Sequence, residues 1–354
     1  MAHEIKALLK MMPEKRASDI HITAGSPVQF RIDENLFPID DHPLTFEETR
    51  ELVYGMLTKT QIDRFEKDLE LDIAFGIPSV GRFRVNVFKQ RGTVASAIRL
   101  IPNDIWTFEQ CGLPADVAVD LCKRPKGLVL VTGATGSGKS TTLASMIDWI
   151  NENRSCHIIT IEDPIEFVHK NKMAIVNQRE LDSDTYSFGA SLKHVLRQDP
   201  DVILIGEMRD LETIESALII AETGHLVFAT LHTSDCVQTI NRVIDVFPAT
   251  QQQQIRTQLS FVLVGVLSQQ LIPRMKAQGR ALAMEILIST PAVRSLIRES
   301  KAHQIYSVIQ TSQKDGMKTM NQALYDLYQQ RSITYEEAFE RTTDVEDLKR
   351  LFKK

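Results

Sequence analysis

One short run of residues has the types and spacing of a phosphate-binding loop. The run Gly133-Ala134-Thr135-Gly136-Ser137-Gly138-Lys139-Ser140 matches the pattern G-x-x-x-x-G-K-[ST] at every fixed position. Its glycines let the backbone bend so that successive N–H groups point at one anion. The Lys139 ammonium can lie against the outer phosphates of a nucleotide, and the Ser140 hydroxyl can ligate Mg²⁺. We therefore predict that this phosphate loop and the adjoining Thr141 bind a nucleotide.

The segments on either side of the phosphate loop have the properties of the strand and helix that the loop requires. Residues 127–132 are apolar and rich in β-branched side chains, which predicts a buried strand. Leu143, Met146, Ile147 and Ile150 then recur at helical spacing, and the start of such a helix favours an anion. An ordinary glycine-rich turn is the alternative, and this order of strand, loop and helix disfavours it.

Polar residues follow the other strands predicted after the phosphate loop. Strands are expected at residues 157–161, 201–205 and 226–230. Glu162 and Asp163 follow the first of these strands, Glu207 the second and His232 the third. The carboxyl ends of parallel strands meet at one edge of a sheet, and hydrolysis of a nucleotide needs an acid and a water-positioning group there. Each residue alone would fit a solvated or structural side chain, but together they favour an active site.

Composition and charge describe an ordinary globular chain. Of the 354 residues, 43% are hydrophobic and 25% are charged, which predicts about two domains with a sizeable core. The net charge of −5 argues against nucleic acid as a partner. The four cysteines include no C-x-x-C pair, so neither a zinc site nor a disulfide framework is predicted.

Hydropathy predicts a soluble, cytoplasmic protein. The longest apolar stretch, residues 261–267, is far shorter than the about 20 residues that a membrane-spanning helix needs. The first residues include Glu4 and lack the apolar core of a secretory signal. Any association with a membrane is expected to be peripheral and to depend on partners.

The periodicity of the chain predicts two domains of different architecture. Residues 1–100 are expected to form a small α+β domain with helices over 4–12 and 45–65 and strands over 19–22, 28–32, 72–75, 82–88 and 93–100. Residues 101–112 are interpreted as a linker. Residues 113–354 alternate strands and helices, which predicts an α/β domain with a mostly parallel sheet, and from about residue 251 the chain is expected to be helical.

Three arginines in the first domain are candidates for contact with phosphate. Arg82 and Arg84 lie two apart on a predicted strand and therefore share one face, and Arg99 ends a neighbouring strand. A solvent-facing strand is one interpretation. The other is a set of arginine fingers, which stabilise charge on a transferring phosphoryl group from another domain or subunit.

These motifs together resemble a known family. Residues 133–140, 159–169, 199–210 and 223–233 are similar to the Walker A, Asp, Walker B and His boxes of the secretion and type IV pilus ATPases. Residues 17–22 and 292–299 also match, the latter resembling the retraction motif AIRNLIRE with departures at Val293 and Ser295. Within the family the chain most resembles the retraction ATPases, because we expect it to lack the additional N-terminal domain and the tetracysteine zinc module usual in assembly and secretion ATPases.

The resemblance implies an architecture and a role for each candidate residue. It implies a homohexamer whose subunits each have a PAS-like N-terminal domain and a RecA-like P-loop domain, with ATP and Mg²⁺ bound between them. Glu207 matches the catalytic base and His232 the γ-phosphate sensor. Glu162 matches the acid near the metal and the attacking water, and with Asp163 and Ser140 it is expected to hold Mg²⁺. Arg82, Arg84 and Arg99 lie where the family places its arginines, and the sequence does not identify which of them reaches the phosphate.

The function implied is that of an ATP hydrolase that drives type IV pilus retraction and twitching motility. It would act at the cytoplasmic face of the inner membrane on a membrane-embedded platform protein, and whether a second retraction ATPase assists is left open. Pilus assembly or type II secretion, which use the same chemistry, is the alternative. A nucleic-acid translocase is disfavoured by the acidic net charge, and a regulator that binds nucleotide without hydrolysing it is disfavoured by the presence of Lys139 and Glu207.

Overall fold

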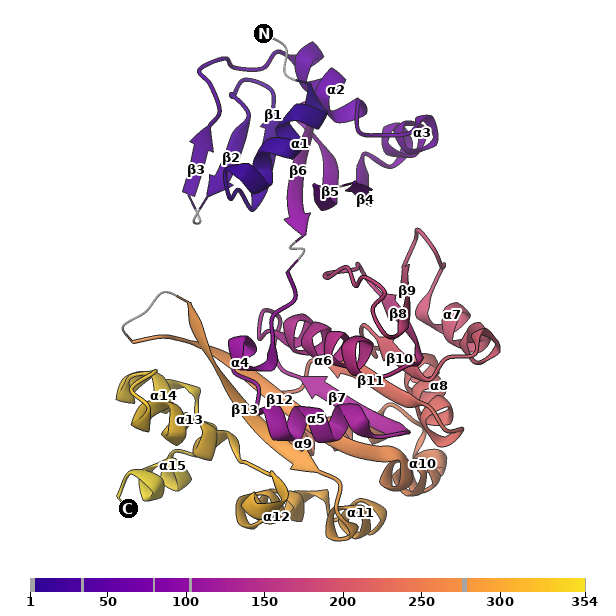
Figure 1. Cartoon of the computed structure of the whole chain (residues 1–354), viewed down its shortest axis with the longest axis vertical. Coiled ribbons are helices and arrows are strands. Elements are labelled where there is room, and N and C mark those ends of the chain that lie inside the picture. Colours follow the sequence, from indigo (N-terminus) through magenta and orange to yellow (C-terminus); the bar gives the residue numbers. More distant parts are fainter. Residues whose placement is uncertain (1–3, 33–34, 79, 102–103, 276–278, 354) are drawn as a thin grey trace. The chain divides into compact units, whose positions relative to one another are not determined.

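The computed structural model describes residues 4–32, 35–78, 80–101, 104–275 and 279–353. They form two compact units, which are described separately (Figure 1). The first unit comprises Met1–Asp104 with Glu166–Val168, and the second comprises Ile105–Ile165 with His169–Lys354. Residues 102 and 103 of the predicted linker lie outside the described residues.

The first unit is a six-stranded antiparallel sheet with helices on one face. The strand order is β3-β2-β1-β6-β5-β4. The strands are β1 (Asp19–Thr23), β2 (Gln29–Ile32), β3 (Asn35–Pro38), β4 (Glu70–Ile77), β5 (Gly81–Gln90) and β6 (Thr93–Ile101). The helices are α1 (Ile5–Glu14), α2 (Phe46–Tyr54) and α3 (Lys59–Asp68). The predicted antiparallel set of strands is confirmed, and the short edge strand β3 was not predicted.

The single helix predicted over residues 45–65 is wrong, because this segment forms α2 and α3. Thr45 and Thr58 each begin a helix with a capping box, in which the threonine side chain accepts from a backbone N–H three residues on. α2 ends at Gly55. The apolar residues of the segment keep a helical spacing throughout, so their spacing alone does not show that one helix ends and another begins. The second capping box is the signal that marks the start of the new helix.

Alternation along the strands of the first unit separates an apolar face from a charged face. Ile20, Phe83, Val85 and Ile98 are buried in one cluster with apolar residues of α1, α2 and α3. Their neighbours along β5, Arg82 and Arg84, project from the opposite face, because successive residues of a strand alternate between faces.

The second unit is built on a seven-stranded sheet of order β13-β12-β7-β11-β10-β8-β9. All neighbouring strands are parallel except β12 and β13, which pair antiparallel. The strands are β7 (Gly127–Thr132), β8 (His157–Glu162), β9 (Ile175–Glu180), β10 (Val202–Ile205), β11 (Leu226–Leu231), β12 (Leu263–Pro273) and β13 (Arg280–Ile288). The predicted parallel sheet is confirmed, and β7 with its neighbour β11 is buried along its whole length.

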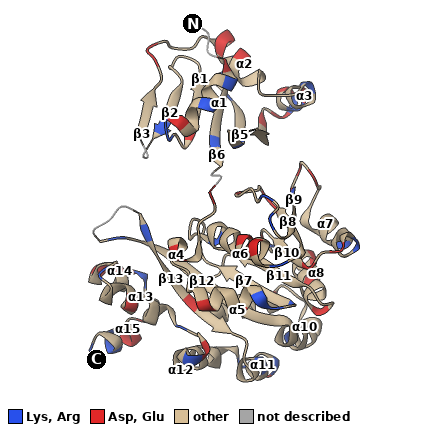
Figure 2. Cartoon of the chain, viewed as in Figure 1, with Lys and Arg blue, Asp and Glu red and all other residues tan. Residues whose placement is uncertain are grey.

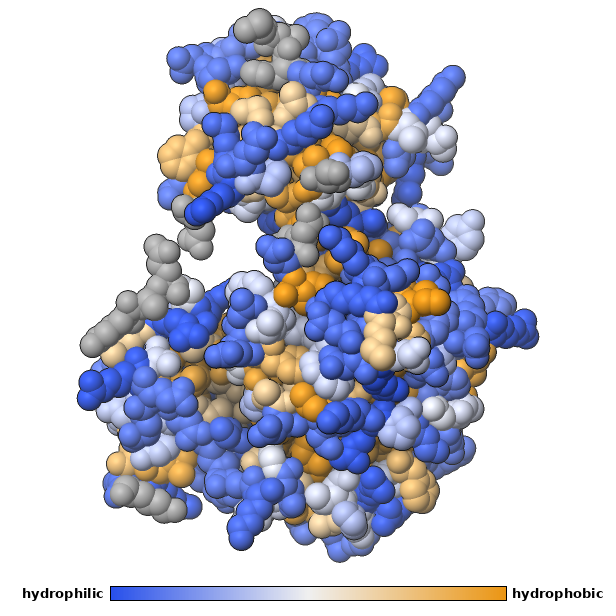
Figure 3. Space-filling model, in the orientation of Figure 1, coloured by the Kyte–Doolittle hydropathy of each residue, from blue (hydrophilic) through white to orange (hydrophobic). Residues whose placement is uncertain are grey.

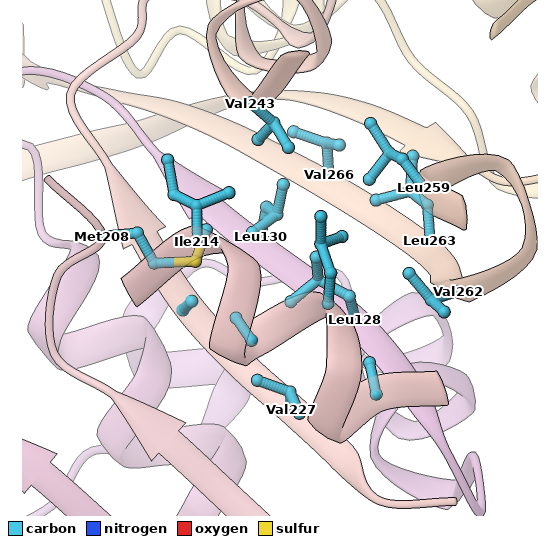
Figure 4. Packing of buried hydrophobic residues seen from close by; sticks show 14 of the residues in the cluster. Leu128, Leu130, Met208, Ile214, Val227, Val243, Leu259, Val262, Leu263 and Val266 are labelled. Atoms are coloured by element: carbon cyan, nitrogen blue, oxygen red, sulfur yellow. The ribbon is translucent and has the colours of Figure 1, made fainter. Parts of the chain in front are cut away.

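Helices cover both faces of this sheet and bury two hydrophobic clusters. On one face lie α4 (Phe108–Cys111), α5 (Ala115–Lys123) and α6 (Lys139–Asn153). The other face packs against α7 (Phe188–Val195), α8 (Leu211–Glu222), α9 (Cys236–Asp245), α10 (Ala249–Val262), α11 (Pro291–Arg298) and α12 (Ile305–Thr311). Figure 4 shows Leu128 and Leu130 of β7 pointing into this second cluster among Ile214, Val243 and Leu259. This packing fixes the ends of the strands to which the candidate site residues belong.

The expectation that the chain is helical from about residue 251 is wrong for residues 263–288. After α10 the chain forms β12, which joins the sheet beside β7, and then β13. A continuous apolar run buried on both faces has no alternation, so its sequence alone does not separate a strand from a buried helix. After β13 the chain is helical, with α11 and α12, then α13 (Met320–Gln329), α14 (Tyr335–Arg341) and α15 (Val345–Phe352), and with short 3₁₀ helices at Ala302–Gln304 and Gln313–Asp315. A further 3₁₀ helix, Leu196–Gln198, follows α7.

The surface is that of a polar, mixed-charge protein. Figure 2 shows Lys and Arg residues interspersed with Asp and Glu residues along the helices of both units. On the face shown in Figure 3, hydrophobic residues lie singly or in small groups among hydrophilic ones. Within the described residues, no helix combines the length and apolarity needed to cross a membrane.

Candidate active site

The phosphate loop leaves the sheet at the carboxyl end of β7 and enters α6. Gly133 has φ +139°, and a Cβ atom there would lie 2.4 Å from the backbone oxygen of Gln269, so both the backbone conformation and the space require glycine. The N-cap of α6 is Gly138, which provides no side-chain cap to the helix. The N–H groups at this helix start are therefore suited to an anion rather than to a capping side chain.

Lys139 spans the inside of the phosphate loop. The side chain is buried, and its Nζ donates to the carbonyl oxygens of Gly133 at 2.8 Å and Ala134 at 3.0 Å. Nζ also lies 3.5 Å from Nδ1 of His232. Burial lowers the pKa of Lys139, and the negative charge of Glu207 opposes that shift. A cation is thus held at the place where the outer phosphates of a nucleotide would lie.

Glu207 lies just beyond the carboxyl end of β10, next to the end of β8. The Gly206 N–H donates to the Ile161 carbonyl at 2.8 Å, and a Cβ atom on Gly206 would lie 3.1 Å from that oxygen, so glycine permits the close approach. Glu207 Oε2 accepts from Arg209 at 2.7 Å, and Oε1 lies 3.0 Å from His232 Nε2. Burial tends to raise the pKa of Glu207, but the Arg209 hydrogen bond and the His232 charge together lower it. The carboxylate is therefore held ionised.

His232 connects Lys139 and Glu207. One ring nitrogen lies within 3.5 Å of Lys139 and the other within 3.0 Å of Glu207. The end of β11 just before His232 is joined to the segment that carries Glu207, because the Thr230 hydroxyl donates to the Gly206 carbonyl and the Met208 N–H donates to the Thr230 carbonyl. The structure thus brings three of the predicted residues into one continuous set of contacts.

The residues predicted to hold Mg²⁺ lie at the same edge of the sheet. Ser140 is exposed in the first turn of α6. Glu162 ends β8, where its Oε1 accepts from Thr160 at 2.5 Å and from Gln178 at 3.1 Å. Asp163 follows it and is exposed. Among the described residues, no group of three or more His, Cys, Asp or Glu side chains could hold a metal ion unaided.

That arrangement fits a metal ion that arrives with its nucleotide. Magnesium is commonly held by one or two carboxylates, waters and substrate phosphates rather than by a cage of protein ligands. A serine hydroxyl and nearby carboxylates supply the oxygen ligands that it prefers.

The candidate arginines lie together on the open face of the first unit. Arg31, Asp19, Arg99 and Arg84 stand opposite one another on β2, β1, β6 and β5 in turn. The Arg99 Nε donates to Asp19 Oδ1 at 2.8 Å, and its side chain remains 69% exposed. Arg84 is also exposed, and Arg82 lies two residues before it on the same face. These arginines therefore form a basic row around one carboxylate.

Two residues that contact the phosphate loop were not predicted. Gln269 of β12 donates from Nε2 to the Ser137 carbonyl at 2.7 Å, and the Arg280 guanidinium of β13 donates to the Gly136 carbonyl at 3.3 Å. A signal for Gln269 exists in the sequence, because Ser268, Gln269 and Gln270 interrupt an otherwise apolar strand. Polar side chains inside a buried strand require partners, and here the partner is the phosphate loop.

Comparison with known proteins agrees with this geometry. The family model described as Type II/IV secretion system protein matches residues 1–340. The type IV pilus retractation ATPase PilT of Pseudomonas aeruginosa is 48% identical over 338 residues, covering 96% of this chain and 98% of that protein. A twitching motility protein of Neisseria gonorrhoeae is 44% identical over 348 residues, covering 98% of this chain and 93% of that protein. A crystal structure of the pilus retraction motor PilT with bound ADP superposes with a TM-score of 0.92 at 52% identity, covering 98% of this chain and 99% of that one.

Proposed function

The chain belongs to the Type II/IV secretion system protein family, and we propose that it is an ATP-hydrolysing motor that drives retraction of type IV pili. The observation that carries the proposal is the set of contacts joining Lys139, His232 and Glu207 beside the phosphate loop. A cation for the phosphates and a carboxylate for the attacking water are the groups that nucleotide hydrolysis needs. The RecA-like core holds them at the carboxyl ends of neighbouring parallel strands.

The proposed reaction uses Glu207 as the general base. Glu207 accepts a proton from a water whose oxygen forms a bond to the γ-phosphorus of ATP, and the bond to the β–γ bridging oxygen breaks to give ADP and phosphate. Arg209 contacts one carboxylate oxygen and His232 the other, and each oxygen keeps a further lone pair that can accept from the attacking water. His232 contacts both Lys139 and Glu207. These contacts support a role in sensing the γ-phosphate, because a change at Lys139 would reach the base Glu207 through the His232 ring.

We propose that Ser140, Glu162 and Asp163 hold Mg²⁺ with the nucleotide. Such an ion would neutralise charge on the phosphates. Lys139 supplies a second positive charge from inside the phosphate loop. The Gln178 and Thr160 hydrogen bonds fix one oxygen of Glu162, which keeps that carboxylate at the end of β8.

We further propose a homohexamer in which Arg82, Arg84 or Arg99 of one subunit completes the site of its neighbour. Among the three single alanine variants, the one that removes this arginine is expected to lower ATP hydrolysis about a thousandfold, as when a required arginine finger is removed, and to keep nucleotide binding. Mixing such subunits with Glu207→Gln subunits should restore hydrolysis, because some sites then combine an intact Glu207 with an intact arginine from the neighbour. The steady-state rate of the mixture is compared with the rates of both separate variants. No recovery on mixing would contradict action across subunits.

The proposed work of the motor is removal of pilin from a pilus through a membrane-embedded platform protein at the cytoplasmic face of the inner membrane. ATP can drive such a movement only if it binds one arrangement of the domains better than another.

If the motor removes pilin from pili, deleting the gene is expected to leave cells with more surface pili and without twitching motility. Electron microscopy counts the pili, and colony spreading measures the motility. Loss of surface pili instead would indicate assembly as the direction of work.

A further inference from the structure

The side chain of Gln269 is part of the wall behind the phosphate loop. Gln269 is only 1% exposed, and its Nε2 donates to the Ser137 carbonyl oxygen at 2.7 Å. Its own backbone oxygen is the atom that a Cβ on Gly133 would approach to 2.4 Å. The strand β12 therefore contacts the phosphate loop with both the backbone and the side chain of one residue.

The hydrogen bond to Ser137 determines the direction of a neighbouring N–H group. The Ser137 carbonyl and the Gly138 N–H belong to one planar trans peptide and point in opposite directions. Because Gln269 holds the carbonyl toward β12, the Gly138 N–H is directed away from β12. Among the described residues that N–H has no hydrogen-bond partner, as expected for a group that faces an anion.

Two buried polar atoms in this contact have further capacity for hydrogen bonding. The Gln269 Oε1 and the Ser137 Oγ are both buried and have no hydrogen-bond partner among the described residues. One is an acceptor and the other is a hydroxyl that can donate. An amide retained in a buried strand with one unpaired oxygen is costly for stability, so packing alone is a poor reason for a glutamine here.

We propose that Gln269 is a positioning residue of the nucleotide site, which holds the peptide between Ser137 and Gly138 in the orientation that binds phosphate. The proposal rests on nucleotide binding at the phosphate loop, as put forward under Proposed function. Its effect is preorganisation, because a loop already held in the binding conformation does not have to be ordered when the ligand arrives.

The test compares Gln269→Met with Gln270→Met in the full-length protein. Methionine has nearly the length of glutamine but cannot donate a hydrogen bond, and Gln270 is the adjacent residue of the same strand with no hydrogen bond from its side chain among the described residues. Gln269→Met is expected to weaken ADP binding roughly tenfold or more, since a buried carbonyl loses its partner. It should raise KM for ATP by a similar factor and change kcat less. Gln270→Met should bind ADP as the wild type does.

Thermal unfolding without nucleotide separates positioning from general damage. The melting temperatures of the two methionine variants should agree within a few degrees, whereas stabilisation by added ADP should be reduced only in Gln269→Met. Gln269→Asn, which keeps the amide but is too short to reach Ser137, is the second variant and decides the question if Gln269→Met does not fold. Wild-type ADP affinity in either folded Gln269 variant overturns the inference. Failure of the wild-type protein itself to bind ADP would instead refute the proposed function.

Discussion

Replacing Glu207 with glutamine is expected to lower the rate of ATP hydrolysis by about 10²- to 10⁴-fold, the range typical of a lost general base. Glutamine keeps the shape of the side chain and can still accept from Arg209, so the site should stay assembled around it. The amide cannot take a proton from water, and nucleotide affinity should therefore be close to that of the wild type. Phosphate release in the steady state and ADP titration measure the two quantities on the same preparation.

A matched control for this variant is Glu215→Gln. Glu215 is an exposed residue of α8 in the same unit, and its substitution removes one negative charge without touching the phosphate loop. The control should hydrolyse ATP at the wild-type rate. If Glu207→Gln also retained its turnover, another group would have to be the base, and Glu162, whose oxygen is held at the end of β8, would be the next candidate.

The part of the site that could be predicted from the sequence is the part encoded within single short segments. The phosphate loop contains its own glycines, lysine and serine, and the strand and helix beside it have clear apolar patterns. Glu162, Glu207 and His232 were found by a rule of parallel sheets, that strand ends meet at one edge. The rule predicts that these residues lie close together. That His232 lies between Lys139 and Glu207 and contacts both is seen only in the structure.

The contacts that could not be predicted join segments that are distant along the chain. Gln269 reaches Ser137 across 132 residues, and Arg99 reaches Asp19 across 80. Such pairs depend on strand order and register, which local patterns do not contain. The strand β12 was also missed, because helices bury both of its faces and so remove the alternation that marks a strand with one exposed face.

Weak local signals explain two further differences. β3 is exposed along its whole length and has no buried face to produce an alternating pattern. The Thr58 capping box marks the boundary between α2 and α3. In the sequence this signal is masked by apolar residues that keep a helical spacing across the boundary. In both cases a short segment is defined by its hydrogen bonds rather than by burial.

Replacing Lys139 with alanine is expected to weaken nucleotide binding by at least tenfold and to reduce ATP hydrolysis below detection. The ammonium is buried and already desolvated in the phosphate loop, so its charge acts on the phosphates with little screening by water. Truncating one partner of a buried charge pair typically costs about 2–5 kcal/mol, or roughly thirtyfold to several thousandfold in affinity. ADP titration and a phosphate-release assay measure both effects.

Two comparisons separate the role of the Lys139 charge from the role of its shape. Lys123→Ala removes an exposed charge at the end of α5 and should leave binding and hydrolysis unchanged. Lys139→Arg keeps the positive charge but changes the shape of the group that carries it. The compact ammonium accommodated by the Gly133 and Ala134 carbonyls is replaced by a planar guanidinium that is too large for the same space inside the phosphate loop. It should therefore remain defective. Because the phosphate loop is the premise of the whole site, full activity of Lys139→Ala would refute the motor function together with the role of the loop.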